Sequence, residues 1–480
     1  MAVCQENRHR LHIFFLPFLA PGHMIPMVDM ARRFTEHGVK STIVTTPLNV
    51  LRIQPSIDHF NNSSENNWPI EILQIKFPSS YFEPGENVSS FQSPSITGEL
   101  LASMNSLRQP FEELLEKHRP DAIVSDALHV WSPDSADMFG IPRLVFHGCG
   151  TFPILVSTKL MDHIPLDDGD DEKKFVVPGL HHRIEMRVSE LPGYVLKRNI
   201  WTDDMVRGYR RSYGVVMNTF TDLEKDYIRD DVATSPSSWE VGPLSLCNRD
   251  KTDMILRGDV IADGFSATCM DWMDSMKPKS VLYVCFGSCG KFTIPQLKEI
   301  LSGLDASGYP YIWVVKSVGG THLSEWLPEE ERRSKKGLIL TGWAPQVLIL
   351  NHNSIGGFMS HCGWNSCLES ITAGVPMVTW PLFGDQFFNM KFIVDVVKVG
   401  VEVGDMVCSE IAEERRVMTR WQIEKAIRRV MDGGDEAVAM RKRVSTLRSL
   451  SLKAVEEGGS SFNNTRRLIN ELMKLKHDKA

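Results

Sequence analysis

Residues 343–386 combine residue types and spacings that suit a negatively charged ligand. An apolar run that ends at His361 predicts a short buried strand, and Gly363 follows at the predicted start of a helix. A glycine at such a turn lets the backbone approach an anion, and the first amides of the helix carry partial positive charge. We expect Asn365 and Ser366 to satisfy amides that the helix leaves unpaired, and His361 to add a donor. The turn is therefore predicted to seat a phosphate group.

The two ends of the same stretch carry side chains for other parts of such a ligand. A second predicted strand, 377–380, is followed by Asp385 and Gln386. An acid and an amide at the carboxyl edge of a parallel sheet suit a polyhydroxylated ligand, because each can bind sugar hydroxyls. Trp343, which opens the stretch, offers a flat face for a base. The pattern predicts a ligand with a base, a diphosphate and a sugar, in that order along the chain.

Two residues in the first half of the chain could act as an acid–base pair. His23 lies at the turn between the first predicted strand and the helix after it, and Asp126 ends a very apolar predicted strand. An imidazole suits a general base because its ordinary pKa is near neutral, and such a base needs a carboxylate to orient it. Judged from local sequence alone, a structural histidine and a helix-capping aspartate are the commoner roles, and Asp134 on the next predicted helix is a rival carboxylate.

The stretch resembles, nearly position for position, the signature box of plant family-1 UDP-sugar-dependent glycosyltransferases, which act on small molecules. The matching residues are the WAPQ motif at Trp343–Gln346, the HCGWNS motif at His361–Ser366, Glu369 and the closing Asp385-Gln386. This is a long, ordered pattern, whereas a lone glycine-rich motif would be weak evidence. The resemblance implies that His23 is the general base for an acceptor hydroxyl and that Asp126, rather than Asp134, is its partner.

The same resemblance implies a direct displacement. The acceptor oxygen loses its proton to His23 and attacks the anomeric carbon while UDP leaves, so an α-linked donor gives a β-glycoside. The UDP-sugar is a co-substrate, and neither a cofactor nor a metal is expected. The cysteine pairs at 285 and 289 and at 362 and 367 lack the second close pair that would complete a zinc site.

By resemblance, Trp343 stacks on uracil, Ala344 pairs with it through its backbone, and Gln346 and Glu369 bind ribose. Without the box, Glu369 would be interpreted as part of a solvated helix face, and Trp364 as a core aromatic residue. The complete set of predicted donor-binding residues is Ser288, Trp343, Ala344, Gln346, His361, Gly363, Trp364, Asn365, Ser366, Glu369, Asp385 and Gln386.

Two series of short apolar runs, alternating with helical patterns, carry these residues. The predicted strands are 12–18, 41–46, 71–77, 122–126, 143–147 and 214–218 in the first half, and 281–286, 311–315, 338–340 and the two of the signature stretch in the second half. Such alternation predicts parallel sheets covered by helices on both faces. The resemblance implies the α/β GT-B architecture, in which two doubly wound, Rossmann-like domains face each other across a cleft.

The alternating pattern breaks after residue 246, where a polar stretch without apolar periodicity predicts a linker. The predicted boundaries are 1–246 for an N-terminal acceptor-binding domain, 247–266 for the linker, 267–460 for a C-terminal UDP-sugar-binding domain, and 461–480 for a last helix that crosses back to the N-terminal domain.

The composition is that of a soluble globular protein. With 480 residues the chain is long enough for two domains, and its net charge of -7 disfavours nucleic-acid binding. The nine cysteines are scattered and odd in number, which is typical of reduced thiols in a cytoplasmic protein. Residues 11–20 lead to no cleavage site, so we predict a buried strand there rather than a signal peptide. No run approaches the ~20 apolar residues that span a bilayer, so no membrane insertion is predicted. We expect a monomer.

The acceptor is the least determined part of the prediction. The first half resembles the plant subgroup that glycosylates triterpenoids, flavonoids and other phenolics, so the expected partners are UDP-glucose and such a small molecule, with a β-O-glucoside as product. Glutamine at position 386 looks like the glucose-preferring form of the box, whereas histidine there is associated with galactose. The specificity loops are predicted at 79–95 and 148–198. The predicted acceptor-binding residues are Phe18, Leu19, Phe82, His147 and Phe387.

Three alternatives remain open at this point. The donor could be UDP-galactose or UDP-glucuronate. A related UDP-sugar enzyme without a hydroxyl acceptor, such as an epimerase, would leave His23 without a role as base. A protein that only binds a nucleotide sugar or a small aglycone would need neither His23 nor Asp126. Product analysis distinguishes the two enzymes, and UDP release that requires an acceptor distinguishes a transferase from a binding protein.

Overall fold

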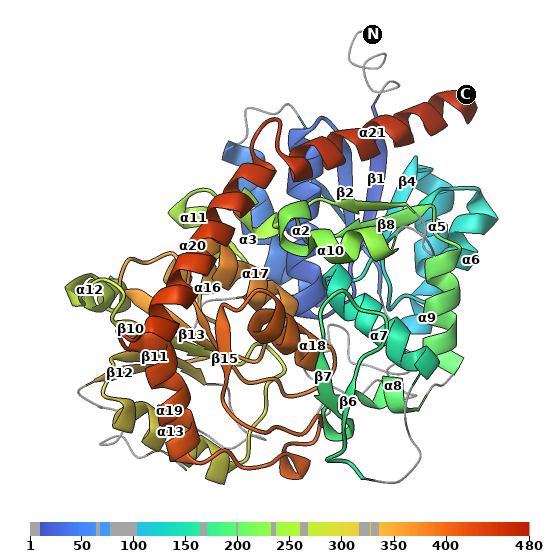
Figure 1. Cartoon of the computed structure of the whole chain (residues 1–480). Helices are drawn as coiled ribbons and strands as arrows, with labels where there is room; N and C mark the ends of the chain where they lie inside the picture. The colour runs from blue at the N-terminus through green and yellow to red at the C-terminus, as the bar shows by residue number, and fades with distance from the viewer. Residues whose placement is uncertain are drawn as a thin grey trace. The chain divides into compact units, whose positions relative to one another are not determined.

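The computed structural model describes residues 10–63, 68–76, 103–163, 170–197, 200–231, 237–259, 267–315, 327 and 336–479. The chain forms two compact units: Met1–Thr151 with Arg198–Asp259 and Leu452–Ala480, and Phe152–Lys197 with Val260–Ser451. Each unit contains one parallel sheet whose strands alternate with helices along the chain (Figure 1). This confirms the predicted α/β class with two Rossmann-like domains.

The first unit contains a seven-stranded sheet. Its strands are β1 (His12–Leu16), β2 (Lys40–Thr45), β3 (Glu71–Gln74), β4 (Ala122–Asp126), β5 (Arg143–Phe146), β8 (Gly214–Met217) and β9 (Ser238–Glu240). The order is β3-β2-β1-β4-β5-β8-β9, and every neighbouring pair is parallel. All residues of β4 are buried, as expected for a strand covered on both faces. The chain order reverses between β1 and β4, which makes this the switch point where doubly wound sheets bind ligands.

The helices of the first unit follow its strands in the expected alternation. They are α2 (Pro21–Glu36), α3 (Pro47–Ser63), α5 (Arg108–His118), α6 (Ser132–Phe139), α9 (Ile200–Arg210), α10 (Thr221–Asp231), α11 (Lys251–Leu256) and the last helix of the chain, α21 (Ser460–Lys479). Ser461 on α21 donates from Oγ to the Gly242 carbonyl at 2.5 Å, and Leu468 and Leu472 are buried in the apolar core of this unit. Helix α21 therefore packs as part of the first unit.

The second unit contains a six-stranded parallel sheet. Its strands are β10 (Val281–Cys285), β11 (Tyr311–Val315), β12 (Gly337–Thr341), β13 (Ile355–Ser360), β14 (Met377–Thr379) and β15 (Gly400–Glu402). The order is β12-β11-β10-β13-β14-β15, so the chain reverses between β10 and β13. Two short antiparallel strands, β6 (Lys174–Val176) and β7 (Glu185–Arg187), lie outside this sheet. The helices are α7 (Thr151–His163), α8 (Gly193–Leu196), α12 (Ala267–Ser275), α13 (Ile294–Ser307), α16 (Gln346–Leu350), α17 (Trp364–Ala373), α18 (Gln386–Lys391), α19 (Arg420–Met431) and α20 (Asp435–Val455).

Residues 152–197 group with the second unit, whereas the sequence boundaries place them in the first domain. Phe152 packs its ring against Phe392 at 5.2 Å, and the buried Lys391 pairs with Glu190 at 3.2 Å. These aromatic and ionic contacts join the segment to residues that follow β14. They link positions far apart in the chain, which local composition does not reveal.

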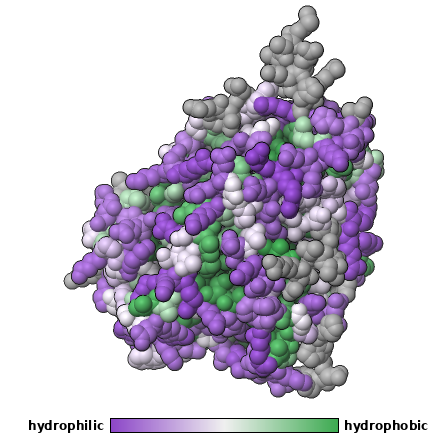
Figure 2. Space-filling view, turned by 45° about the horizontal axis from the view of Figure 1, so that its top comes forward, coloured by the Kyte–Doolittle hydropathy of each residue, from purple (hydrophilic) through white to green (hydrophobic). Residues whose placement is uncertain are grey.

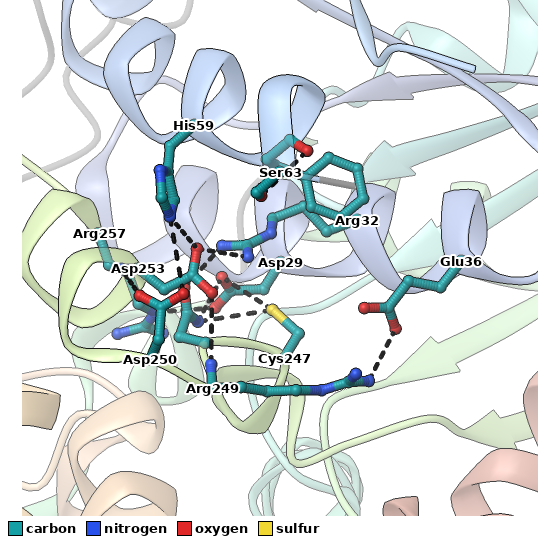
Figure 3. A network of polar contacts seen from close by, with 12 residues as sticks. Asp29, Arg32, Glu36, His59, Ser63, Cys247, Arg249, Asp250, Asp253 and Arg257 are labelled. Carbon is teal, nitrogen blue, oxygen red and sulfur yellow. Dashed lines mark hydrogen bonds and ion pairs between the residues drawn. The ribbon is translucent and has the colours of Figure 1, made fainter. Parts of the chain in front are cut away.

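Residues 247–259, the described part of the predicted linker, are packed onto the first unit (Figure 3). Arg32 on α2, which is 3% exposed, donates to Asn248 Oδ1 at 2.8 Å and to Asp253 Oδ1 at 2.7 Å. Asp29, one turn earlier on α2, accepts from Asn248 Nδ2 at 3.0 Å and from Arg257 Nε at 2.9 Å. The polarity of this stretch therefore reflects its pairing with buried charges, which offsets part of their desolvation.

One cluster in this network has side chains of the types that bind metals. His59, Asp250 and Asp253 offer ligand atoms that lie within 4.8 Å of one another. However, Asp253 already accepts a hydrogen bond from the Arg32 guanidinium at 2.7 Å, and Asp250 accepts one from the Asp253 backbone amide at 2.8 Å as the cap of α11. The arginine charge opposes a cation there, so we interpret the cluster as part of the ion network.

Hydrophilic side chains predominate on the face shown in Figure 2, and hydrophobic ones form smaller areas between them. Large hydrophobic side chains that are more than half exposed include Leu51, Met138, Ile200 and Trp421, which lie on four different helices. Among the residues that the structure describes, no helix is long and apolar enough to cross a membrane.

Candidate active site

Two neighbouring strands bring His23 and Asp126 together: His23 lies in the first turn of α2, which follows β1, and Asp126 is the last residue of β4. Because β1 pairs in parallel with β4, the turns after these strands lie at the same edge of the sheet. His23 Nδ1 lies 2.7 Å from Asp126 Oδ2. Asp126 is 0% exposed, whereas the His23 side chain is 28% exposed, so a buried carboxylate orients a ring that solvent can reach. The rival Asp134 instead pairs with Arg211 at 2.7 Å, and both side chains are exposed.

The Asp126 carboxylate is ionised in this arrangement. Burial by itself raises the pKa of Asp126, but the attraction of His23, the hydrogen bond from its ring and a 2.9 Å bond from the Leu128 amide together lower it below its usual value. An ionised carboxylate only accepts hydrogen bonds, so His23 Nδ1 must be the donor. In that tautomer the basic lone pair of the ring is on Nε2, and this nitrogen can take a proton from a substrate.

Two neighbours hold the His23 ring in place. The Phe18 ring contacts it edge to face, with 5.5 Å between centroids. Gly148 has φ +71°, and a Cβ added there would lie 3.2 Å from His23 Nδ1, so a side chain would press against the ring. Sequence analysis did not single out Gly148. It could have been found as a glycine two residues after β5, because a glycine near a strand often marks a close approach of the backbone to another group.

The other predicted acceptor-binding residues differ in their surroundings. Burial lowers the pKa of His147 to about 4, so its ring is neutral at pH 7. Leu19 is 1% exposed and Phe387 is 0% exposed, which leaves both with almost no surface for a ligand. Phe82, together with the predicted loop around it, lies outside the described residues. An acceptor-binding role for these residues stays a prediction.

The predicted strand–turn–helix of the phosphate seat is confirmed, because β13 leads directly into α17. In the turn, Cys362 has φ +64°, and Gly363 is the N-cap residue, with no side-chain cap. As expected, Asn365 and Ser366 lie in the first turn of this helix. That their side chains satisfy its unpaired amides stays a prediction. A helix start whose N-cap residue has no side chain suits the approach of an anion.

Two glycines closely approach the His361 ring, Gly363 in this turn and Gly287 after β10. A Cβ added at Gly287 or Gly363 would be 2.5 Å from the ring, so neither position accommodates a side chain without displacing it. Burial lowers the pKa of His361 to about 4, and the ring is neutral at pH 7. A neutral imidazole still offers one N–H donor to a phosphate. Ser288 is half-buried and directly follows Gly287. Sequence analysis missed Gly287, whose φ of +70° is evident only in the structure.

The predicted ribose-binding residues hydrogen-bond to each other. Gln346 Nε2 donates to Glu369 Oε2 at 2.8 Å and to Ser366 Oγ at 3.0 Å. Glu369 is 4% exposed, so the alternative of a solvated helix face is wrong. Trp343 is half-buried, and Trp364 is 3% exposed, as the core-aromatic alternative expects. Ala344 is 7% exposed.

Asp385 and Gln386 lie at the start of α18. Gln386 Oε1 accepts from the backbone amides of Leu382 at 2.9 Å and Phe383 at 3.3 Å. Because both donors occupy the oxygen, the orientation of the Gln386 amide is determined and its nitrogen can donate elsewhere. Asp385 is half-buried and accepts from Asn389 Nδ2 at 3.0 Å. Sequence analysis did not single out Asn389, although its spacing of four from Asp385 places the two side chains on one helix face.

We expect the stability of the protein to fall as the pH falls from about 6.5 to about 4. Burial lowers the pKa of His12, His147 and His361 to about 4 from an ordinary value of 6.5. In this window the unfolded chain binds protons at these rings and the folded chain does not, so the free energy of unfolding declines by roughly 1 kcal/mol per histidine at pH 5.5. Asp126, whose folded-state pKa is lowered, contributes stability above an unfolded-state pKa of 3.8 and loses it only at lower pH.

Denaturant titrations at pH 7.5 and 5.5 measure this loss. The His12→Asn variant changes none of the predicted catalytic or donor-binding residues. It should lose less stability between the two pH values than the unaltered chain. An equal loss in both proteins would contradict the role of half-buried His12.

Comparison with known proteins bears on what these residues do. The sequence profile of the family described as UDP-glucoronosyl and UDP-glucosyl transferase matches residues 186–445. The chain is 40% identical to anthocyanin 3'-O-beta-glucosyltransferase of Gentiana triflora, with 98% of this chain and 100% of that protein covered. It is 41% identical to scopoletin glucosyltransferase of Nicotiana tabacum, with 96% and 98% covered.

Solved structures confirm the fold class. Glycyrrhiza uralensis UGT73P12, complexed with glycyrrhetinic acid 3-O-monoglucuronide, is 37% identical with a TM-score of 0.90, and the match covers 98% of this chain and 97% of that one. Medicago truncatula UGT71G1, complexed with UDP-glucose, is 25% identical with a TM-score of 0.79 over 98% and 100% of the two chains. Since the profile covers more than half of the chain and the relatives match nearly all of it, the chain belongs to the UDP-glucoronosyl and UDP-glucosyl transferase family and is a UDP-glycosyltransferase of the plant family-1 type.

Proposed function

We propose that this enzyme transfers glucose from UDP-glucose to a hydroxyl group of a small plant metabolite, a triterpenoid, flavonoid or other phenolic, and gives a β-O-glucoside. The observation that carries the proposal is the 2.7 Å hydrogen bond between His23 and the buried Asp126. An oriented base of this kind is what a hydroxyl nucleophile needs, whereas a protein that only binds a nucleotide sugar has no use for one.

In this mechanism, His23 Nε2 takes the proton of the acceptor hydroxyl as the oxygen attacks the anomeric carbon. The bond from that carbon to the acceptor oxygen forms, the bond to the diphosphate oxygen breaks, and UDP leaves with the electron pair. Asp126 stabilises the imidazolium that His23 becomes, and the proton then passes to solvent. A single attack from the face opposite the leaving group converts an α-linked donor into a β-glucoside.

The leaving diphosphate needs donors that neutralise its charge. We assign this role to the uncapped first turn of α17, with Asn365 and Ser366, and to His361 and Ser288. Removing one preorganised donor of this kind typically raises the barrier by ~2.7–4 kcal/mol. With these donors in place, the proposal requires no metal ion or other cofactor.

Glucose is favoured as the donor sugar by two observations. Gln386, whose amide orientation is determined by two backbone donors, is the box residue that the resemblance associates with glucose. The Gentiana and Nicotiana relatives are named as glucosyltransferases. The Glycyrrhiza structure contains a glucuronide, so UDP-glucuronate is the alternative donor that an observation supports.

Initial rates with UDP-glucose, UDP-galactose and UDP-glucuronate, each against a panel of triterpenoids, flavonoids and coumarins, test the proposal. We expect UDP-glucose to give the highest kcat/KM, UDP to be released only when an acceptor is present, and EDTA to leave the rate unchanged. Mass spectrometry and NMR of the product should show one added hexose in a β linkage. A faster reaction with another donor would contradict the glucose assignment, and epimerised UDP-sugar without a glycoside would contradict the transferase mechanism.

A further inference from the structure

Asn389 connects two parts of the predicted donor site that are remote in the sequence. It lies on α18 and is 0% exposed. Its Nδ2 donates to Asp385 Oδ2 at 3.0 Å and to the backbone carbonyl of Cys362 at 3.0 Å. Asp385 is the proposed sugar ligand, and Cys362 lies in the turn that starts α17, 27 residues before Asn389. One amide nitrogen therefore joins the sugar end of the site to the diphosphate end.

The orientation of the Asn389 amide follows from its partners. A carboxylate oxygen and a carbonyl oxygen both only accept hydrogen bonds, so the group facing them must be the NH2 and not the oxygen. Its two N–H groups match the two acceptors. Within the described part of the chain, Oδ1 of Asn389 is buried and has no hydrogen-bond partner. An unpaired buried oxygen is unfavourable, so the two donations from Nδ2 have to outweigh it.

The orientation of both acceptor groups matters for the predicted donor site. The Asp385 side chain can turn about its χ angles unless one oxygen is fixed, and the sugar hydroxyls would meet the orientation that results. Cys362 has φ +64°, a left-handed conformation that a residue with a Cβ adopts only when its surroundings impose it. A hydrogen bond to its carbonyl helps to impose that conformation on the turn.

We infer that Asn389 is a positioning residue for sugar transfer. Its Nδ2 binds both the Asp385 carboxylate and the Cys362 carbonyl. It therefore sets the distance between the sugar-binding carboxylate and the diphosphate seat. The anomeric carbon lies between these two parts of a UDP-sugar, so this distance decides where that carbon is presented. The inference rests on the proposed donor roles of Asp385 and of the turn before α17.

The test compares Asn389→Leu with a control at an exposed asparagine, Asn351→Leu. Leucine keeps the branched shape of asparagine, although it is bulkier, and it removes both donors. Asn351 also donates from Nδ2 to a backbone carbonyl, that of Val347 at 2.8 Å, and has no assigned role in donor binding. Titration calorimetry gives the Kd of UDP and of UDP-glucose for each protein, and steady-state kinetics with an acceptor gives kcat.

For Asn389→Leu we expect the affinity for UDP-glucose to fall about tenfold or more, because two hydrogen bonds that orient the sugar end are lost. The affinity for UDP should fall much less, since the His361 ring and the Cys362 amide bond to Ser360 Oγ at 3.3 Å still support the turn. The ratio of the two Kd values is the diagnostic quantity. kcat should fall with it, whereas Asn351→Leu should leave the ratio and kcat unchanged.

A residue that only stabilised the fold would lower the melting temperature and leave the Kd ratio as it is, and that result would overturn the inference. If Asn389→Leu does not fold, Asn389→Ser, which keeps one donor, should show a smaller change in the same ratio, and an unchanged ratio would again overturn it. The donor proposal fails separately: in that case the unaltered enzyme itself binds UDP and UDP-glucose equally well.

Discussion

Replacing His23 by alanine is expected to lower kcat about 1000-fold while the Kd of UDP-glucose changes less than about threefold. The loss follows from removing the only group that the 2.7 Å contact with Asp126 orients as a base. Donor affinity should be preserved because all predicted donor-binding residues belong to the other compact unit of the chain. Single-turnover rates and calorimetry of UDP-glucose measure the two quantities independently.

A histidine at the other end of the same helix provides the control. His37 follows the last turn of α2, where its Nδ1 lies 2.8 Å from the Arg33 carbonyl, and His37→Ala should retain kcat. Asp126→Asn should lower kcat by an amount similar to His23→Ala, and the double variant should be no slower than the slower single one, because the two residues act as a unit. Ordinary turnover in His23→Ala would rule out the base assignment.

The second large effect is expected from Gly287→Ala. Its Cβ would lie 2.5 Å from Cε1 and Nε2 of His361, and the residue has φ +70°. Because Gly363 also approaches this ring closely, the ring has little room to move without shifting the turn that seats the diphosphate. A misplacement of about 1 Å at a reacting group lowers the rate roughly 100-fold, so we expect kcat/KM for UDP-glucose to fall by that order.

Gly308→Ala separates this steric effect from backbone strain. Gly308 has φ +77° but no atom within 4 Å of an added Cβ. The left-handed conformation should therefore cost a similar ~1 kcal/mol of stability in both variants. Only Gly287→Ala should lose donor affinity, as measured by the Kd of UDP and the KM of UDP-glucose. Equal kinetic losses in the two variants would show that strain alone, and not contact with His361, is responsible.

Much of the fold follows from local sequence. Every predicted strand begins within one residue of its observed start, because apolar runs bounded by turn residues are local properties of the chain. The short strands β9 and β15, of three residues each, were not predicted, since so few residues carry no detectable period. The positions of His23 after the first strand and of Asp126 at the end of another were likewise predictable, and parallel pairing places the ends of these two strands at one edge.

The rest of the fold depends on contacts between residues that are far apart in the chain, and the local sequence does not reveal such contacts. The polarity of residues 247–266 predicts a linker, yet side chains in the described part, 247–259, pair with buried charges on α2. Residues 152–197 pair with side chains that follow β14.

By itself, the sequence determines which residue types stand at the carboxyl ends of the strands, because strand ends and turns are encoded within a few neighbouring residues. Only the tertiary structure decides how those residues are oriented. The bond from Asn389 to Cys362, the close approach of Gly287 to His361 and the choice of Asp126 over Asp134 each depend on the order of strands in a sheet and on which side chains become buried there.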